Sequence, residues 1–418
     1  MITRKKFINN TAMLYIMSAA QHIFPLFTLP YLTRVLEPDL YGVVVYLTAV
    51  VSYVRTFINF GFGLSSTKLI AENSKDSTRV GAILGATLQA STLLALVSSV
   101  VYTALVFAIP LMRANIMMAY LYLLGVILEI LLPDFLFLGL EKMAVITGRY
   151  LVAKTVTTAL TFVVVRSKAD ILWIPMLQII GTLLAASLVW FEIRVKLKIV
   201  PVLSRWKESL AMLKNSSVYF FSSFATTAFG VTNTALVGIF LPPSQVSFWG
   251  VSYGLINSAI SLYRPITNSL FPHMVKKRDT KLIRWLLFVL FPIIIAVTGL
   301  VFLFSGTVIN VFCGHKYMAA VPVFQALLPV LIFSFPVMVI GFPVLGAFGM
   351  VKETTKSTVI AAIFHIAGLG LLLAFGWFNL INIAILRCGT EAVLLGARSW
   401  YLLRYMRRRR KPAPERLP

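Results

Sequence analysis

Acidic residues are scarce in this chain of 418 residues, which contains 14 Asp and Glu against 38 Lys and Arg. Charged residues make up 12% of the chain, about half the share that is typical of a soluble domain. Hydrophobic residues make up 59%, and the mean hydropathy is +0.88. So little polar surface excludes an ordinary cytosolic enzyme, because a water-soluble globule of this size would need far more of it.

Residues and motifs that support catalysis are also missing. The two cysteines, Cys313 and Cys388, match no metal or redox spacing, so we expect both to be packing residues. The sequence has no nucleotide-binding loop, HExxH pair or CxxC motif. We therefore predict neither an enzyme nor a cofactor. The net charge of +24 would suggest nucleic acid in a soluble protein, but here the position of the positive residues matters more, and no nucleic-acid partner is expected.

What the chain has in abundance is long apolar stretches separated by short polar connections. A helix needs about 20 apolar residues to cross a bilayer. The pattern therefore predicts an all-α polytopic membrane protein with about twelve transmembrane helices. The predicted spans are 11–33, 41–61, 80–108, 116–137, 145–165, 171–191, 216–241, 246–271, 284–304, 321–342, 357–376 and 380–402.

The distribution of Lys and Arg between the connections predicts the orientation. The connections on the side of the N-terminus carry 27 of them and those on the other side carry 5. Cytoplasmic loops retain basic residues, so both termini are expected in the cytoplasm. Segment 203–214 has apolar residues at helical spacing and should lie on the cytoplasmic surface, and the basic tail 404–418 should sit against anionic lipid head groups.

A weak internal repeat divides the chain in two. At an offset of 205 residues, Ser18 meets Ser223, Pro38 meets Pro243 and Arg79 meets Arg284. Transporters often duplicate a bundle in this way and place the substrate path between the halves. We therefore expect two six-helix bundles, 1–200 and 201–403, around a central cavity.

Several segments resemble the polysaccharide transporter family, which includes the O-antigen and repeat-unit flippases. They include LPYLTRVLEPDLYG at 29–42, GFGLSSTKLIAENSKD at 61–76, FLFLGLEKM at 135–143 and SLYRPITNSLFPHM at 261–274. That family belongs to the multidrug/oligosaccharidyl-lipid/polysaccharide superfamily. The resemblance implies a V-shaped cavity between two bundles and a substrate made of an oligosaccharide on undecaprenyl pyrophosphate. The implied partners are this lipid-linked oligosaccharide and the membrane lipids, with the polysaccharide polymerase machinery as a further candidate.

Ionisable residues inside the predicted spans are the candidate site residues, because each is costly there unless it has a partner or a wet cavity. Arg55 and Arg264 lie in corresponding spans of the two halves, at similar depth. An Arg fork matches phosphate oxygens, so the two could clamp the pyrophosphate. The alternative is that both extend toward the head groups. Asn59, one turn after Arg55, could add a hydrogen bond or serve only in packing.

Two further basic residues enter the fifth span from the cytoplasmic side. Arg149 and Lys154 are five residues apart and cannot share one helix face, and Lys154 is the deeper. Lys154 could face the cavity, extend to the head groups or pair with a carboxylate. Arg398, near the end of the last span, is expected to extend to the cytoplasmic interface.

The carboxylates in the spans have two possible roles. Glu129 is a candidate for ion coupling, because a membrane carboxylate can bind H⁺ or Na⁺ and release it on the other side; the alternative is a buried partner for Lys154. Arg387 and Glu391 are four residues apart, which favours an ion pair along one helix face. As alternatives, Arg387 is a candidate for substrate binding and Glu391 is a candidate for ion coupling.

The leading functional hypothesis is a flippase for lipid-linked oligosaccharides that works by alternating access. Because basic residues outnumber acidic ones inside the spans, an anionic cargo is favoured over cationic drugs. A multidrug exporter of the same superfamily is the alternative. A membrane polysaccharide polymerase is disfavoured, because the outward connections are short.

Overall fold

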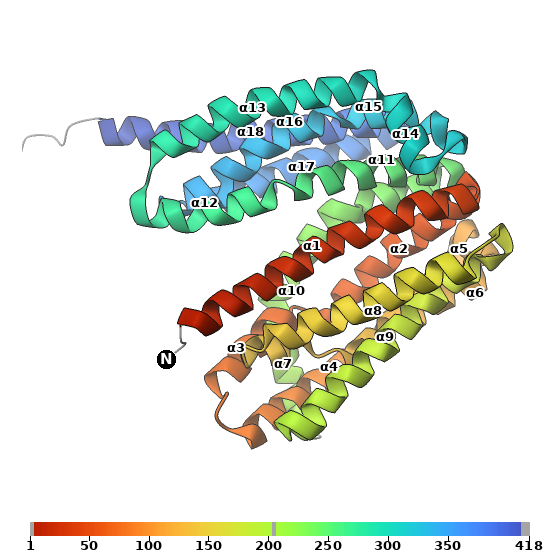
Figure 1. The fold of residues 1–418 in the computed structure, drawn as a ribbon, viewed down its shortest axis with the longest axis vertical. Helices are drawn as coiled ribbons and strands as arrows, with labels where there is room; N and C mark the ends of the chain where they lie inside the picture. Colours follow the sequence, from red (N-terminus) through yellow and green to blue (C-terminus); the bar gives the residue numbers. More distant parts are fainter. Residues whose placement is uncertain (1–3, 203–205, 411–418) are drawn as a thin grey trace, which may run out of the picture. The chain divides into compact units, whose positions relative to one another are not determined.

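The computed structural model describes residues 4–202 and 206–410, which form helices joined by short turns (Figure 1). The chain divides into two compact units, Met1–Ser247 and Phe248–Pro418. Within the described residues, nine helical segments are long and apolar enough to cross a membrane. Three of the predicted spans, 145–165, 216–241 and 246–271, are not among these nine.

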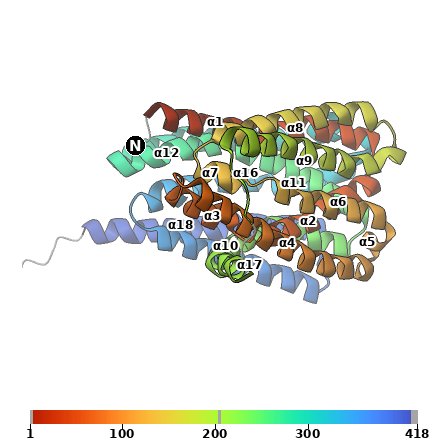
Figure 2. The same cartoon turned by 90° about the horizontal axis from the view of Figure 1, so that it is seen from below.

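The first unit packs helices from distant parts of the sequence side by side. In it α1 contacts α8, α8 contacts α9, α9 contacts α6, and α2 lies against α4, α6 and α10 (Figures 1 and 2). The helices are α1 (Arg4–Val35), α2 (Pro38–Asn59), α3 (Phe62–Glu72), α4 (Ser77–Ala108), α5 (Pro110–Ala114), α6 (Ile116–Leu128), α7 (Asp134–Gly139), α8 (Met143–Val164), α9 (Trp173–Phe191) and α10 (Trp206–Phe240).

In the second unit α18 is the central helix and contacts α15, α16 and α17. The helix α11 (Pro243–Ser261) starts in the first unit and continues into the second. The others are α12 (Arg264–Lys277), α13 (Thr280–Leu303), α14 (Ser305–Cys313), α15 (Val321–Leu327), α16 (Pro329–Val339), α17 (Val351–Ala374) and α18 (Leu380–Arg410). A π-helical segment, Ile340–Gly346, follows α16, and Gly341 within it has non-helical backbone angles.

Large apolar side chains cover much of the outer surface of the helices. Val100 is 73% exposed, Phe288 80% and Leu303 78%. Such an exterior is unfavourable in water but matches the hydrocarbon of a bilayer. A multi-span helical membrane protein was predicted on composition, and this prediction is confirmed.

Two predicted spans of the first unit are interrupted near one end. After α2 the chain turns at Phe60 and Gly61, which both have positive φ, and continues as α3. After α6 come a 3-10 turn, Glu129–Leu131, and Pro133, and then the short α7. The helices beyond the two breaks pack together, and Thr67 of α3 donates to the carbonyl of Phe135 in α7. The connection expected at 62–79 is thus mostly helix.

Helices in the two halves begin in similar ways. The carboxylate of Asp76 caps α4 by accepting hydrogen bonds from the backbone N–H groups of Thr78 and Arg79. In the same way, Asp279 caps α13 by accepting from the backbone N–H groups of Lys281 and Leu282. Pro38 and Pro243 are the first residues of α2 and α11, where a missing N–H costs nothing. These local matches agree with the repeat, whose six-helix halves remain a prediction.

The ends of two helices differ from expectation. The helix α10 continues without a break from Trp206 to Phe240, so a separate surface helix at 203–214 is not formed there; residues 203–205 lie outside the described ones. This helix contacts α2, α3 and α4, and its compact unit therefore extends beyond residue 200. The last helix runs on to Arg410, and the rest of the predicted tail, 411–418, is outside the described residues.

The expectation that Arg398 extends to the cytoplasmic interface is wrong. Its side chain is buried, and its Nη1 donates to the carbonyl oxygen of Val337 at 2.5 Å. Its other nitrogens approach the hydroxyls of Ser357 and Thr358. It therefore does not extend to the interface: it holds a carbonyl at the end of α16, next to the irregular backbone at Gly341.

Candidate functional site

The first unit contains a cavity of about 1030 Å³. This is at the upper end of the range of about 300–1,000 Å³ that is usual for small-molecule sites, so the cavity suits a bulky ligand. Helices α1, α2, α6, α8 and α9 contribute to its wall. The charged residues that line it are Arg55, Glu129, Asp134, Arg149 and Lys154.

The two helix breaks form part of the cavity wall. Gly61 at the first break and Leu132 at the second both line it. Breaks leave backbone groups without helical partners, which membrane proteins tolerate where the chain faces protein or a wet cavity. One such group is satisfied by a side chain, since the Trp190 indole donates to the carbonyl of Leu131 at 3.0 Å. The breaks therefore place Glu129 and Asp134 at the cavity.

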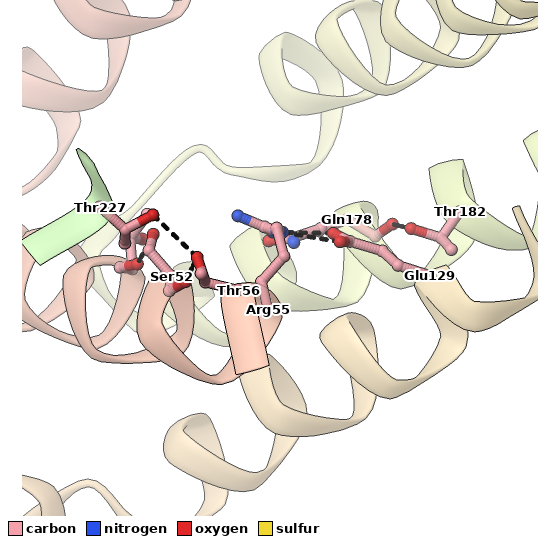
Figure 3. Close-up of polar contacts among 8 residues, drawn as sticks. Ser52, Arg55, Thr56, Glu129, Gln178, Thr182 and Thr227 are labelled. Atoms are coloured by element: carbon pink, nitrogen blue, oxygen red, sulfur yellow. Dashed lines mark hydrogen bonds and ion pairs between the residues drawn. The ribbon is translucent and has the colours of Figure 1, made fainter. Parts of the chain in front are cut away.

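A two-pronged ion pair lies across the cavity wall between α2 and the end of α6 (Figure 3). Arg55 Nε is 2.6 Å from one carboxylate oxygen of Glu129, and Nη2 is 2.7 Å from the other. The two side chains remain 35% and 24% exposed. Glu129 was considered as a partner for Lys154; its partner is Arg55 instead. The guanidinium fork thus already holds a planar anion supplied by the protein.

Lys154 lines the same cavity from α8. It is exposed, and among the described residues no carboxylate lies within ion-pair distance of its Nζ. The opposing charges of Arg55 and Glu129 both act on it. Lys154 is therefore the cavity cation whose charge is least compensated.

A second ion pair forms nearer the start of α8. Arg149, which is only 7% exposed, binds the carboxylate of Asp134 through Nη2. Its Nε has no hydrogen-bond partner among the described residues. The cavity wall thus carries three basic and two acidic residues, and both carboxylates are occupied by arginines.

Five of the eight predicted site residues line this cavity: Arg55, Asn59, Glu129, Arg149 and Lys154. The other three lie in the second unit. Arg264 is exposed and is the first residue of α12, after a break, whereas Arg55 precedes the break that follows α2. Arg387 and Glu391 form the expected pair at 2.6 Å, and both are buried.

Polar residues on α8 and α9 also line the cavity and were not predicted. Thr157, Thr158 and Thr161 follow Lys154 at helical spacing, and Gln178 and Thr182 face the same space from α9. The signal was present in the sequence, since positions 154, 157, 158 and 161 share one face of a helix. These residues were not singled out because a neutral hydroxyl within a span costs much less free energy than a charge does.

Helix α2 also makes polar contacts with α10. The hydroxyls of Thr56 and Thr227 are 2.9 Å apart (Figure 3), and those of Tyr53 and Thr232 are 2.7 Å apart. Phe60, at the break, stacks on Phe220 with ring centroids 4.4 Å apart. Interhelical hydrogen bonds of this kind hold membrane helices together, so α10 fixes the helix that carries Arg55.

Comparison with known proteins identifies a family and relatives that match most of the chain. A family model described as "Polysaccharide biosynthesis protein" matches residues 7–278. A protein of Shigella dysenteriae named "Putative O-antigen transporter" is 27% identical over 365 residues, which cover 85% of this chain and 90% of that one. A protein of the same name from Escherichia coli (strain K12) is 24% identical over 269 residues, covering 63% and 64% of the two chains.

Solved structures share the fold. An inward-facing multidrug resistance MATE family transporter of the MOP superfamily superimposes with a TM-score of 0.67. The match covers 93% of this chain and 96% of that one, at 13% identity. At this identity the likeness concerns the fold alone, which is that of a MATE-like multi-span transporter.

Proposed function

Because this chain belongs to the polysaccharide biosynthesis protein family, we propose that it flips undecaprenyl-pyrophosphate-linked oligosaccharide units from the inner to the outer leaflet of the bacterial cytoplasmic membrane. Its relatives are transporters, and two of them carry O-antigen transport in their names. Alternating access would carry the glycan and pyrophosphate through the protein while the polyprenyl tail stays in lipid. A transporter needs no catalytic group.

The Arg55–Glu129 pair is the observation that carries this proposal. A guanidinium that forms two parallel bonds to a carboxylate offers the same geometry to two phosphate oxygens. Lys154 adds a cation that no carboxylate in the described residues neutralises. A pyrophosphate can therefore bind Lys154 first and then displace Glu129 from Arg55.

Displacing Glu129 supplies a route to ion coupling. Its carboxylate would lose both bonds to Arg55, and an unpaired charge within a membrane-spanning segment is costly. Binding H⁺ or Na⁺ would neutralise it. When the substrate leaves, Arg55 recovers its partner and the ion is released. Substrate binding and ion binding would then be coupled through the charge state of a single carboxylate, so that the two bind together and leave together.

The other predicted residues have supporting roles in this proposal. Arg149 would hold Asp134 in place at the cytoplasmic end of the cavity, and Asn59 would hydrogen-bond the phosphate or first sugar. Arg264 would be the second phosphate ligand, contributed by the second unit. Arg387 and Glu391 would act mainly as a structural pair, because their bond is local and buried.

The topology that we propose has twelve spans and both termini in the cytoplasm. It rests on the charge imbalance of the connections, 27 basic residues against 5, and on the even number of spans. Membrane-impermeant thiol labelling of single cysteines, in a variant lacking Cys313 and Cys388, tests it. Label from outside the cell should reach cysteines placed beside Arg34, Lys168 and Lys316. Protection of any two would contradict this map.

Export of cationic drugs is the alternative within the superfamily. It would need carboxylates that are free to bind a cation, whereas both cavity carboxylates are held by arginines. A polysaccharide polymerase would need outward acceptor chemistry, and the predicted outward connections are too short for it.

Complementation of a flippase-null strain tests the proposal. Arg55→Ala should abolish glycan display at a normal protein level in the membrane, and Arg55→Lys should restore part of it, because charge remains while the fork is lost. Arg113→Ala, at an exposed position outside the cavity, is the matched control and should display glycan normally. Normal display by Arg55→Ala at wild-type abundance would refute the phosphate role of Arg55.

The same strain tests the contribution of the second unit. Arg264→Ala should also abolish display, and the Arg55→Ala, Arg264→Ala double variant should be no more active than either single variant. If Arg264→Ala is tolerated while Arg55→Ala is not, Arg264 is removed from the clamp and the cavity of the first unit suffices.

A further inference from the structure

The cavity differs in chemistry along α8. Among the residues that the structure describes, the charged ones that line it from α8 are Arg149 and Lys154, whereas Thr157, Thr158 and Thr161 line it from the turns that follow. From Lys154 to Thr161 the helix rises about 10 Å. The neutral stretch is therefore long enough for a short oligosaccharide beside a phosphate bound at Lys154.

The neighbouring helix continues this neutral surface. Gln178 and Thr182 of α9 line the cavity with Gly181 between them, and no lining residue of the described part of α9 is charged. A Cβ added at Gly181 would lie 2.6 Å from the methyl carbon of Thr157 and 3.8 Å from its hydroxyl oxygen. This close contact between helices turns the methyl group of Thr157 toward α9 and so fixes its hydroxyl.

The hydrogen bonds of these hydroxyls define what they can recognise. The hydroxyl of Thr157 donates to the carbonyl of Lys154, that of Thr161 to the carbonyl of Thr157, and that of Thr182 to the carbonyl of Gln178. A hydroxyl has one proton and two lone pairs. With their protons used, the three oxygens offer acceptor sites to the cavity, and they suit a ligand that is rich in O–H donors.

From this juxtaposition we infer that the α8–α9 face is a subsite for uncharged sugars, with Thr157, Thr161 and Thr182 as specificity-determining residues. The inference rests on the proposed function, in which the diphosphate binds at Arg55 and Lys154. The sugar next to the diphosphate donates its hydroxyl protons to the threonine oxygens, and the Gln178 amide can both donate and accept. A sugar carboxylate would meet acceptors there and no compensating cation, so acidic sugars are disfavoured at this position.

Binding of two short-chain probes to the purified full chain in nanodiscs tests the subsite. Farnesyl diphosphate carries no sugar, and farnesyl diphospho-N-acetylglucosamine carries one neutral sugar. The Thr157→Val, Thr161→Val double variant should lose about tenfold in affinity for the sugar-bearing probe, the effect of losing two hydrogen bonds. Its affinity for farnesyl diphosphate should stay within about twofold of wild type, as removal of neutral hydroxyls leaves the phosphate ligands in place.

Thr155→Val is the matched control, since Thr155 lies on the same helix but is exposed and does not line the cavity. It should change neither affinity. A further probe with glucuronic acid as its sugar should bind wild type more weakly than the N-acetylglucosamine probe. Equal or tighter binding of the glucuronic acid probe would refute the preference for uncharged sugars.

The outcomes separate this inference from the proposed function. If the double variant lowers the affinity for both probes equally, or for neither, the subsite is refuted. In that case, loss of farnesyl diphosphate binding in Arg55→Ala would still support the diphosphate site. If wild type binds neither probe, the proposed function fails and the subsite fails with it.

Discussion

Glu129 occupies the fork of Arg55 when no substrate is bound, so its removal has a quantitative consequence. Two unit charges about 4 Å apart attract by about 4 kcal/mol at an effective dielectric constant of about 20. Here the side chains are 35% and 24% exposed, and solvent screening together with desolvation leaves a net coupling of about 1–2 kcal/mol. A ligand that must displace Glu129 is weakened by that amount.

The expected result is that Glu129→Gln binds farnesyl diphosphate about 5- to 30-fold more tightly than wild type, whereas Arg55→Gln binds it more weakly. The coupling itself is measured by a double-mutant cycle with Arg55→Gln and Glu129→Gln, using unfolding of the purified protein in detergent. The cycle should give about 1–2 kcal/mol. The gain in affinity and the coupling energy should then agree.

The exposed pair of Lys68 and Glu72, 4.0 Å apart on α3, provides the control cycle. A surface pair of this kind should couple by no more than about 0.5 kcal/mol. Weaker probe binding by Glu129→Gln, or additive effects of the Arg55 and Glu129 variants, would refute the competition between Glu129 and the diphosphate.

Two further predictions concern the packing that supports the cavity. Trp190→Phe should cost about 1–3 kcal/mol of stability in the same unfolding assay, because the Leu131 carbonyl at the helix break loses its donor, whereas Trp173→Phe, at an exposed position on the same helix, should be nearly neutral. Gly85→Ala should reduce the amount of protein in the membrane, because its Cβ would collide with the carbonyl oxygen of Val202, while Gly148→Ala, which meets nothing within 4 Å, should accumulate normally. Equal effects within either pair, scored by unfolding for the tryptophans and by immunoblot for the glycines, would contradict these contacts.

The sequence by itself determined the class of protein and most of its helices. Hydropathy adds up along a chain, so the long apolar runs identified a helical membrane protein before any contact was known. A charge within such a run is equally visible, and for that reason Arg55, Glu129 and Lys154 were singled out. The pair of Arg387 and Glu391 was also predictable, because residues four apart on one helix are neighbours whatever the rest of the fold does.

Tertiary structure alone decided which distant charges meet. Arg55 and Glu129 are 74 residues apart in sequence, and their contact depends on the rotation and height of two helices and on the break that ends α6. Arg398 was misjudged for the same reason: its acceptor, the Val337 carbonyl, is buried beside an irregular backbone segment that the sequence does not reveal. Periodicity assigns a residue to a face of its own helix, whereas a binding site requires the faces of several helices to be brought to one level, and only packing does that.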